Sequence, residues 1–146
     1  MNDVEIQIVP FGSTIYEQTI TLRDDVLRKP IGLAYTPEQL ALEHDEVHIA
    51  AVLNGNVIGV LLLRKGESRV LKMRQVAVAT AFQRCGIGHK LVVFAEKFAK
   101  ENNFVAIELH ARESALAFYK SLHYTQIGDE FTEVGLPHFK MKKLIL

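Results

Sequence analysis

Hydrophobic and polar residues follow two different periods along this chain, and the changes between them predict its elements. Apolar residues alternate with polar ones, or form short runs, in segments that predict strands at 6–11, 48–53, 57–63, 70–78, 104–109, 124–127 and 139–144. Apolar residues recur every three or four positions in segments that predict helices at 14–29, 37–43, 86–100 and 114–121. The predicted order is strand, two helices, three strands, helix, strand, helix and two strands.

Local signals support several of these boundaries. Thr14 with Glu17, and Thr36 with Gln39, have the spacing of capping boxes at the starts of the first two helices. Asn54-Gly55-Asn56 is typical of a hairpin turn between the second and third strands. In the first predicted helix, Tyr16, Ile20, Arg23 and Leu27 follow one another at helical spacing.

The order of elements predicts a mixed sheet. A strand, a helix and another strand follow one another from Val70 to Leu109, and a helical crossover joins parallel neighbours. The three strands before that crossover should form an antiparallel meander. We therefore predict a single α+β domain over residues 1–146, with a central mixed sheet and helices on both faces.

Composition and charge narrow the class of protein. The chain has 146 residues, of which 49% are hydrophobic, and its 17 basic and 17 acidic side chains cancel. A neutral chain has no net field that would recruit nucleic acid or an anionic membrane, so we expect neither as a partner. Cys85 is the single cysteine, the first residues lack a signal-peptide pattern, and no apolar run approaches ~18 residues. These features favour a cytoplasmic enzyme or binding domain.

A glycine-containing segment, Gln83-Arg84-Cys85-Gly86-Ile87-Gly88, lies between a predicted strand and a predicted helix. Glycines allow tight turns, and the free N–H groups at a helix N-terminus bind phosphate. His89-Lys90 follows without the Ser or Thr of a Walker A loop, and the third glycine of a dinucleotide fingerprint is missing. Close packing of the helix start is the structural alternative for the two glycines. Lys72, Arg74, Arg84 and Lys90 lie near the segment in sequence.

The segments around this loop complete a recognisable pattern. Met73–Val78 precedes it, Ala111–Tyr124 follows it, and Phe131–Lys143 comes next along the chain. Together with Gln-x-x-Gly-x-Gly, these segments resemble the GCN5-related N-acetyltransferases (GNAT), in particular a small bacterial branch of undefined substrate. The resemblance covers roughly residues 47–143. It implies the three-layer GNAT acyl-CoA N-acyltransferase fold with about seven strands, acetyl-CoA as co-substrate, a primary amine or amino sugar as acceptor, and often a homodimer.

The resemblance also implies roles for individual residues. Backbone N–H groups from Arg84 to Gly88 would bind the CoA pyrophosphate, and the last residues of the preceding strand would pair with the pantetheine arm as the parallel strands splay apart after Val78. Tyr119 would contact the cofactor and protonate the leaving thiolate; a packed core tyrosine is the alternative. The expected cofactor-binding residues are Val76, Ala77, Val78, Gln83, Arg84, Cys85, Gly86, Ile87, Gly88 and Tyr119.

The motifs do not determine which residue acts as the general base. Many relatives have glutamate near the position of Gln75, but glutamine cannot accept the proton of an ammonium group. Glu113 and His110 are the candidates that we predict, with His138 as a further one, and each histidine also has a structural interpretation. Arg112 stands where many relatives have asparagine, and either holds an anionic substrate group or joins a surface ion pair. Because His44 and His48 fall on either side of a predicted helix-to-strand change, we predict no metal site.

Two further functions are compatible with the sequence. Gln75 and Arg112 depart from the family pattern, so an acyl-CoA sensor or scaffold without catalysis is the alternative to an enzyme. A nucleotide-binding protein could use the same loop. The residues themselves do not identify the acceptor or the oligomeric state. Segments 28–37 and 129–138 should form the loops that shape the acceptor pocket.

Overall fold

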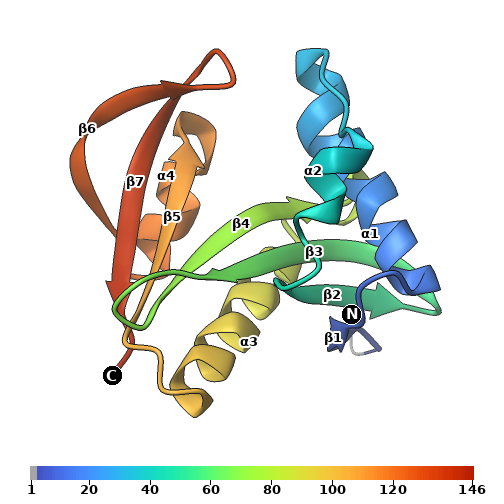
Figure 1. Ribbon diagram of the computed structural model, residues 1–146, viewed down its shortest axis with the longest axis horizontal. Helices are drawn as coiled ribbons and strands as arrows, with labels where there is room; N and C mark the ends of the chain where they lie inside the picture. Colours follow the sequence, from blue (N-terminus) through green and yellow to red (C-terminus); the bar gives the residue numbers. More distant parts are fainter. Residues whose placement is uncertain (1–2) are drawn as a thin grey trace. The chain divides into compact units, whose positions relative to one another are not determined.

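The computed structural model (Figure 1) describes residues 3–146. The chain forms two compact units. The first unit contains residues up to Arg64 together with Gln75–Ala95, and the second contains Lys65–Arg74 and Glu96–Leu146. Two strands (Asn56–Lys65 and Val70–Val78) and one helix (Ile87–Glu101) contribute residues to both units.

The order of elements agrees with the prediction. The strands are β1 (Glu5–Val9), β2 (Val47–Leu53), β3 (Asn56–Lys65), β4 (Val70–Val78), β5 (Ala106–Arg112), β6 (Thr125–Glu133) and β7 (Leu136–Leu144). The α-helices are α1 (Thr14–Arg23), α2 (Pro37–Ala41), α3 (Ile87–Glu101) and α4 (Leu116–Ser121). Short turns of other helix types are η1 (Asp24–Arg28), η2 (Lys29–Ile31), η3 (Thr80–Phe82) and η4 (Glu113–Ala115).

The seven strands follow the order β1-β2-β3-β4-β5-β7-β6. The ladder between β4 and β5 is parallel and pairs Val70–Met73 with Ala106–Leu109. The ladders β1–β2, β2–β3, β5–β7 and β6–β7 are antiparallel. The predicted mixed α+β sheet with a helical crossover is therefore confirmed.

In the first unit, helices cover both faces of the sheet (Figure 1). Leu22 of α1 packs with Val60, Leu62 and Ala77 in one buried cluster. Side chains alternate across a strand, so Gly59 faces the opposite side. There a Cβ added to Gly59 would lie 2.9 Å from Leu91 Cδ1 of α3. Glycine thus allows α3 to lie directly against β3.

In the second unit, β5 pairs with β7, and β6 and β7 form a hairpin. Its turn consists of Val134 and Gly135, which both have positive φ angles, as a type I′ turn requires. The buried Tyr124 donates a hydrogen bond from its hydroxyl to Glu96 at 2.9 Å, and Lys143 forms an ion pair with the same carboxylate, also at 2.9 Å. These contacts tie the last turns of α3 to the sheet of this unit.

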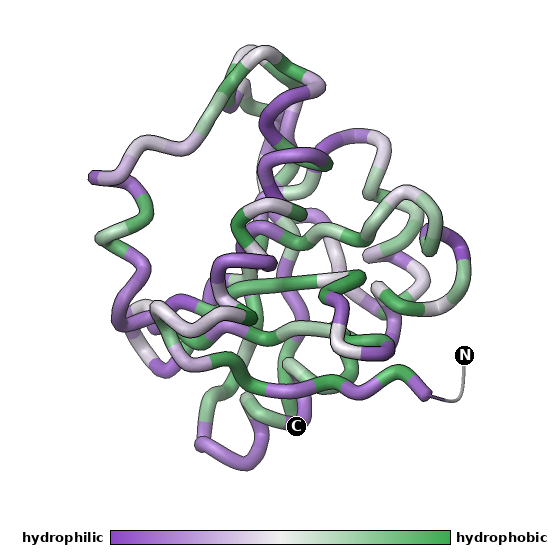
Figure 2. The backbone as a smooth tube through the Cα atoms, turned by 90° about the vertical axis from the view of Figure 1, so that its right-hand side faces the viewer, coloured by the Kyte–Doolittle hydropathy of each residue, from purple (hydrophilic) through white to green (hydrophobic). Residues whose placement is uncertain are grey.

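Local sequence signals were correct at some boundaries and wrong at others. The Asn54-Gly55 turn and the Thr36–Gln39 capping box are confirmed. The capping box at Thr14 is wrong, because Ser13 is the N-cap and accepts from the Tyr16 N–H. The first strand ends at Val9 and alternates polar and apolar residues beside the N-terminus (Figure 2). The predicted strand at 124–127 extends to Glu133, so segment 129–138 forms a hairpin and not a loop.

Candidate functional site

The glycine segment forms an exposed turn that leads directly into α3. Arg84 and Gly86 both have left-handed backbones, with φ angles of 63° and 84°. The side-chain amide of Gln83 donates a hydrogen bond to the Val78 carbonyl at 3.0 Å and so ties the turn to the end of β4. The predicted cofactor-binding residues of β4 and of the turn are therefore held together in the first unit.

The start of α3 presents backbone donors. The N–H of Lys90 donates to the Gly86 carbonyl at 3.1 Å, so this bond closes the first turn of the helix. The N–H groups of the residues before Lys90 have no partner in an α-helix, and the positive end of the helix dipole adds to their attraction for anions. The side chain of Arg84 is exposed and has no acidic partner among the described residues. A phosphate group fits this chemistry.

Gln75 interrupts the regular backbone of β4. Its φ angle is 55°, so the directions of the N–H and C=O groups change within the strand, as in a bulge. Ala77 lies in the buried core, and Val76 and Val78 are half-buried. Backbone groups next to Gln75 can thus point away from the usual ladder direction while the strand remains anchored by its side chains.

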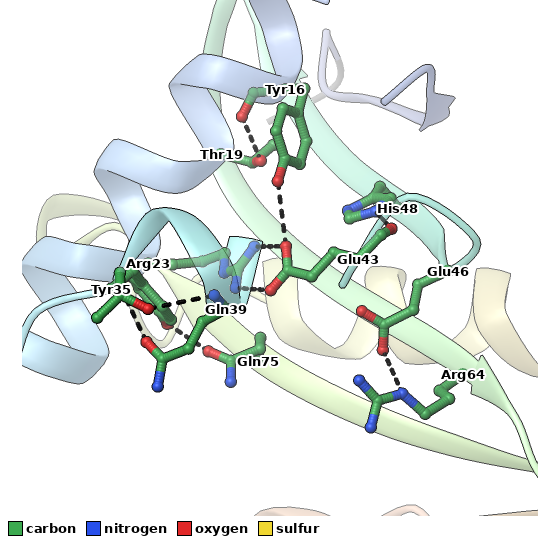
Figure 3. Close-up of polar contacts among 11 residues, drawn as sticks. Tyr16, Thr19, Arg23, Tyr35, Gln39, Glu43, Glu46, His48, Arg64 and Gln75 are labelled. Carbon is green, nitrogen blue, oxygen red and sulfur yellow. Dashed lines mark hydrogen bonds and ion pairs between the residues drawn. The ribbon is translucent and has the colours of Figure 1, made fainter. Parts of the chain in front are cut away.

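A polar cluster with a buried centre extends to Gln75, and sequence reasoning missed it (Figure 3). Arg23 and Glu43 form a buried ion pair with two hydrogen bonds of 2.8 and 2.5 Å. The Tyr16 hydroxyl donates to Glu43 at 3.2 Å. The guanidinium carbon of Arg23 lies 4.7 Å from the centre of the Tyr35 ring, and the Tyr35 hydroxyl donates a short hydrogen bond to Gln75. One chain of contacts therefore joins α1, the turn after α2 and β4.

Electrostatics stabilise the charged state of this cluster. Burial alone would lower the pKa of the Arg23 guanidinium, but hydrogen bonds and charges from Glu43 and Tyr35 raise it above its ordinary value. Burial, together with the nearby Glu43 carboxylate, raises the pKa of Tyr16, so its phenol remains a donor. A sequence signal did exist, because Arg23 stands in the apolar stripe of the first helix and a charge there needs a buried partner. The partner lies twenty residues away.

Tyr119 lies in the second unit on α4, where it is buried between Phe118 and Tyr124. No hydrogen-bond partner for its hydroxyl is present among the described residues. Burial raises the pKa of Tyr119, so its phenol is protonated at neutral pH. The side chain can therefore donate a hydrogen bond, and its role in catalysis stays a prediction.

His110 and His138, two of the candidate bases, both lie near Glu133, an acid that the sequence did not indicate. His110 Nδ1 lies 2.9 Å from Glu133, and His138 Nε2 lies 3.6 Å from the same carboxylate. A carboxylate oxygen accepts hydrogen bonds, so the Nδ1–H tautomer of His110 fits this contact and leaves Nε2 as an acceptor. Glu113 is exposed at the start of η4. Among the predicted bases, His110 is thus the one within hydrogen-bond distance of a carboxylate, because His138 Nδ1 instead contacts the Leu136 carbonyl at 2.9 Å.

His44 and His48 each contact a backbone carbonyl through one ring nitrogen. His44 Nδ1 lies 3.0 Å from the Ala41 carbonyl, and His48 Nε2 lies 2.9 Å from the Glu43 carbonyl. Within residues 3–146, no group of three or more His, Cys, Asp or Glu side chains is arranged to hold a metal ion.

The part of the chain that the structure describes includes no helix that is long and apolar enough to cross a membrane.

Comparison with known sequences identifies the class of protein that this fold and loop define. The family model described as "Acetyltransferase (GNAT) domain" matches residues 24–145, which is most of the chain. The chain therefore belongs to the GNAT acetyltransferase family. The match includes both β4 and the glycine turn.

Individual relatives support the family and the fold. The YyaT protein of Bacillus subtilis is 30% identical over 84 residues, which cover 55% of this chain and 57% of that protein. The match thus spans less than two thirds of that relative's length. A provisional N-acetyltransferase from Lactobacillus plantarum has a similar structure, with a TM-score of 0.87 and 21% identity over 99% of this chain and 100% of that one. An aminoglycoside 6'-N-acetyltransferase in complex with coenzyme A has a TM-score of 0.82 at 15% identity, over 97% of each chain. At these identities the two structures establish the fold alone.

Proposed function

We propose that this protein is an acetyl-CoA-dependent N-acetyltransferase whose acceptor is a primary amine. The observation that carries the proposal is the exposed left-handed turn before α3, held to the end of β4 by Gln83, in a chain of the GNAT family. Its backbone N–H groups and Arg84 would bind the pyrophosphate of acetyl-CoA. That co-substrate supplies an acetyl group activated as a thioester.

The expected reaction is direct attack in a ternary complex. The neutral amine nitrogen forms a bond to the acetyl carbon, and the carbon–sulfur bond breaks. Backbone donors at the irregular part of β4 near Val76 would stabilise the oxyanion. Tyr119 would protonate the departing thiolate, while His110, oriented by Glu133, or alternatively Glu113, would receive the amine proton through water. A small molecule or amino sugar is favoured as acceptor. Homodimer formation and cytoplasmic location stay predictions.

Gly86→Glu tests the loop assignment. A glutamate at this position places bulk and negative charge where the pyrophosphate would lie, so acetyl-CoA binding measured by calorimetry should be lost. Gly12→Glu is a matched control, because Gly12 is also exposed, has a φ angle of 80° and has open space around its Cβ position. Both variants carry the same backbone strain and charge. Wild-type affinity in Gly86→Glu would refute the assignment.

Turnover separates an enzyme from an acyl-CoA sensor. Release of free CoA with an amine panel supports the enzyme, whereas tight acetyl-CoA binding without turnover of any amine would favour the sensor. Thermal protection by ATP without comparable protection by CoA would favour a nucleotide-binding protein. These three results exclude one another.

A further inference from the structure

Arg23, at the end of α1, and Arg28, at the end of η1, both lie against the ring of Tyr35. The guanidinium carbons of Arg23 and Arg28 are 4.7 and 4.6 Å from the centre of the Tyr35 ring. Residues five positions apart do not share a face of an α-helix, which has 3.6 residues per turn. Here Asp24–Arg28 is a π-helix, whose wider turn brings both arginines to the same ring. Such π-helical turns often occur at functional sites.

The two arginines differ in their electrostatic environment. Arg23 is buried and neutralised by the two hydrogen bonds from its guanidinium group to Glu43. Arg28 is half-buried, and no carboxylate lies within ion-pair distance of it among the described residues. The neighbouring Lys29 instead pairs with Asp25 at 2.8 Å and with Asp24 at 3.7 Å. Within residues 3–146, Arg28 is thus a positioned cation whose guanidinium N–H groups have no carboxylate partner.

Stacking and hydrogen bonding use different parts of a guanidinium group. The guanidinium carbon of Arg28 lies over the Tyr35 ring, and this cation–π contact restricts the position of the group. The N–H donors lie at its edge and form a fork that matches the two oxygens of a carboxylate. Tyr35 therefore prepares Arg28 to bind a planar anion without spending much side-chain entropy on binding.

The same tyrosine connects Arg28 to the proposed reaction centre. The Tyr35 hydroxyl donates a hydrogen bond to the Gln75 side chain, and Gln75 is the left-handed residue directly before Val76. Val76–Val78 is the segment proposed to pair with the pantetheine arm. An acceptor held at Arg28 would therefore have its anionic group at one end of this contact chain, with Gln75 at the other.

We propose that Arg28, stacked on Tyr35, binds the carboxylate of an acceptor amine, so that the substrate class is amino acids or other amines carrying an anionic oxygen group. This inference rests on the proposed acetyltransferase function. It assigns to Arg28 the recognition of anions, and to Tyr35 and Gln75 the placement of that group relative to β4.

Steady-state kinetics of CoA release test this assignment. The panel consists of α-, β- and γ-amino acids, each paired with its methyl ester, together with aminoethyl phosphate as a second anion. In wild type at least one acid should be preferred over its ester. Arg28→Met should raise KM for that acid by about 10- to 100-fold, the equivalent of a lost charged hydrogen-bond pair, and leave KM for the ester unchanged. Esterification also lowers the pKa of the substrate amine. The deciding quantity is therefore the change in KM from wild type to Arg28→Met, compared between each acid and its ester.

Two variants separate specific recognition from general charge. Lys29→Met also removes one positive charge but should leave the KM values for acid and ester unchanged. Arg28→Lys keeps the charge and loses the planar fork, so it should recover only part of the affinity for the acid. Equal KM values for the acid in Arg28→Met and wild type, or no preference for any acid over its ester, would overturn the inference.

Calorimetry distinguishes failure of this inference from failure of the proposed function. If no amine supports CoA release, the acetyltransferase proposal fails, and titration of the same acids and esters into the protein still tests Arg28. Binding of an acid that is lost in Arg28→Met, at an unchanged thermal midpoint, supports the anion site. Binding that is equal in both proteins, or absent in wild type, refutes it. Aminoethyl phosphate that binds more tightly than every acid would overturn the carboxylate assignment and assign the site to phosphate.

Discussion

Replacing Glu43 with glutamine should destabilise the protein strongly, because it leaves the buried Arg23 without a counter-ion. The side chains of Arg23 and Glu43 are 0% and 4% exposed, and water cannot solvate the remaining charge. Breaking a buried pair from one side costs about 3–5 kcal/mol. That is a large fraction of the roughly 5–15 kcal/mol that stabilises a typical domain.

Urea unfolding followed by circular dichroism measures this loss. With an m value of about 2 kcal/mol/M, the midpoint of Glu43→Gln should fall by on the order of 2 M. Arg23→Met combined with Glu43→Leu should recover most of the loss, because apolar residues of similar volume replace the pair. Asp25→Asn is the control, since its exposed pair with Lys29 should contribute little. A cost below about 1 kcal/mol for Glu43→Gln would refute the reasoning, because that is the value of a surface pair.

Three other outcomes can be measured directly. Tyr119→Phe should lower turnover by roughly 10²-fold with acetyl-CoA affinity retained, and unchanged turnover over the full pH range would remove this phenol from the mechanism. Gly59→Ala should lower the unfolding free energy by about 1–3 kcal/mol, because the new Cβ lies 2.9 Å from Leu91 Cδ1; a wild-type urea midpoint would show that α3 can shift without cost. Burial and the Glu96 carboxylate raise the pKa of Tyr124 above its ordinary value, so the contribution of this phenol to stability should be constant below about pH 10 and fall above it, and Tyr124→Phe should make the alkaline loss of stability less steep. An identical slope in the variant would contradict the assigned cause.

Local residue choices were sufficient to predict most of the elements. β4 begins and ends where its alternating residues predict, and the Asn54-Gly55 turn occurs where two left-handed residues are tolerated. The phosphate-binding turn could be located as well, because glycines, a helix start and a preceding strand are neighbours in sequence. Ser13 replaced Thr14 as the cap because either hydroxyl could serve, and only the path of the chain from Pro10 selects between them.

Features that depend on distant partners were not predictable in the same way. Arg23 was visible in an apolar stripe, but its partner Glu43 comes from the segment after another helix. The meeting of His110 and His138 at Glu133 depends on the register of three strands. Nothing in the residues around Glu133 distinguishes it from other exposed acids.

The amino-acid sequence alone determined the types of element, their order and the glycine turn, because hydrophobic period, capping and backbone freedom act over a few neighbouring residues. Tertiary structure decided which polar groups meet. The hydrogen bond from Tyr35 to Gln75 joins residues forty positions apart, and the contact of Arg28 with Tyr35 depends on a π-helical turn that the hydrophobic period did not predict. Burial then sets the charge and orientation of these groups, and the proposed choice of acceptor depends on both.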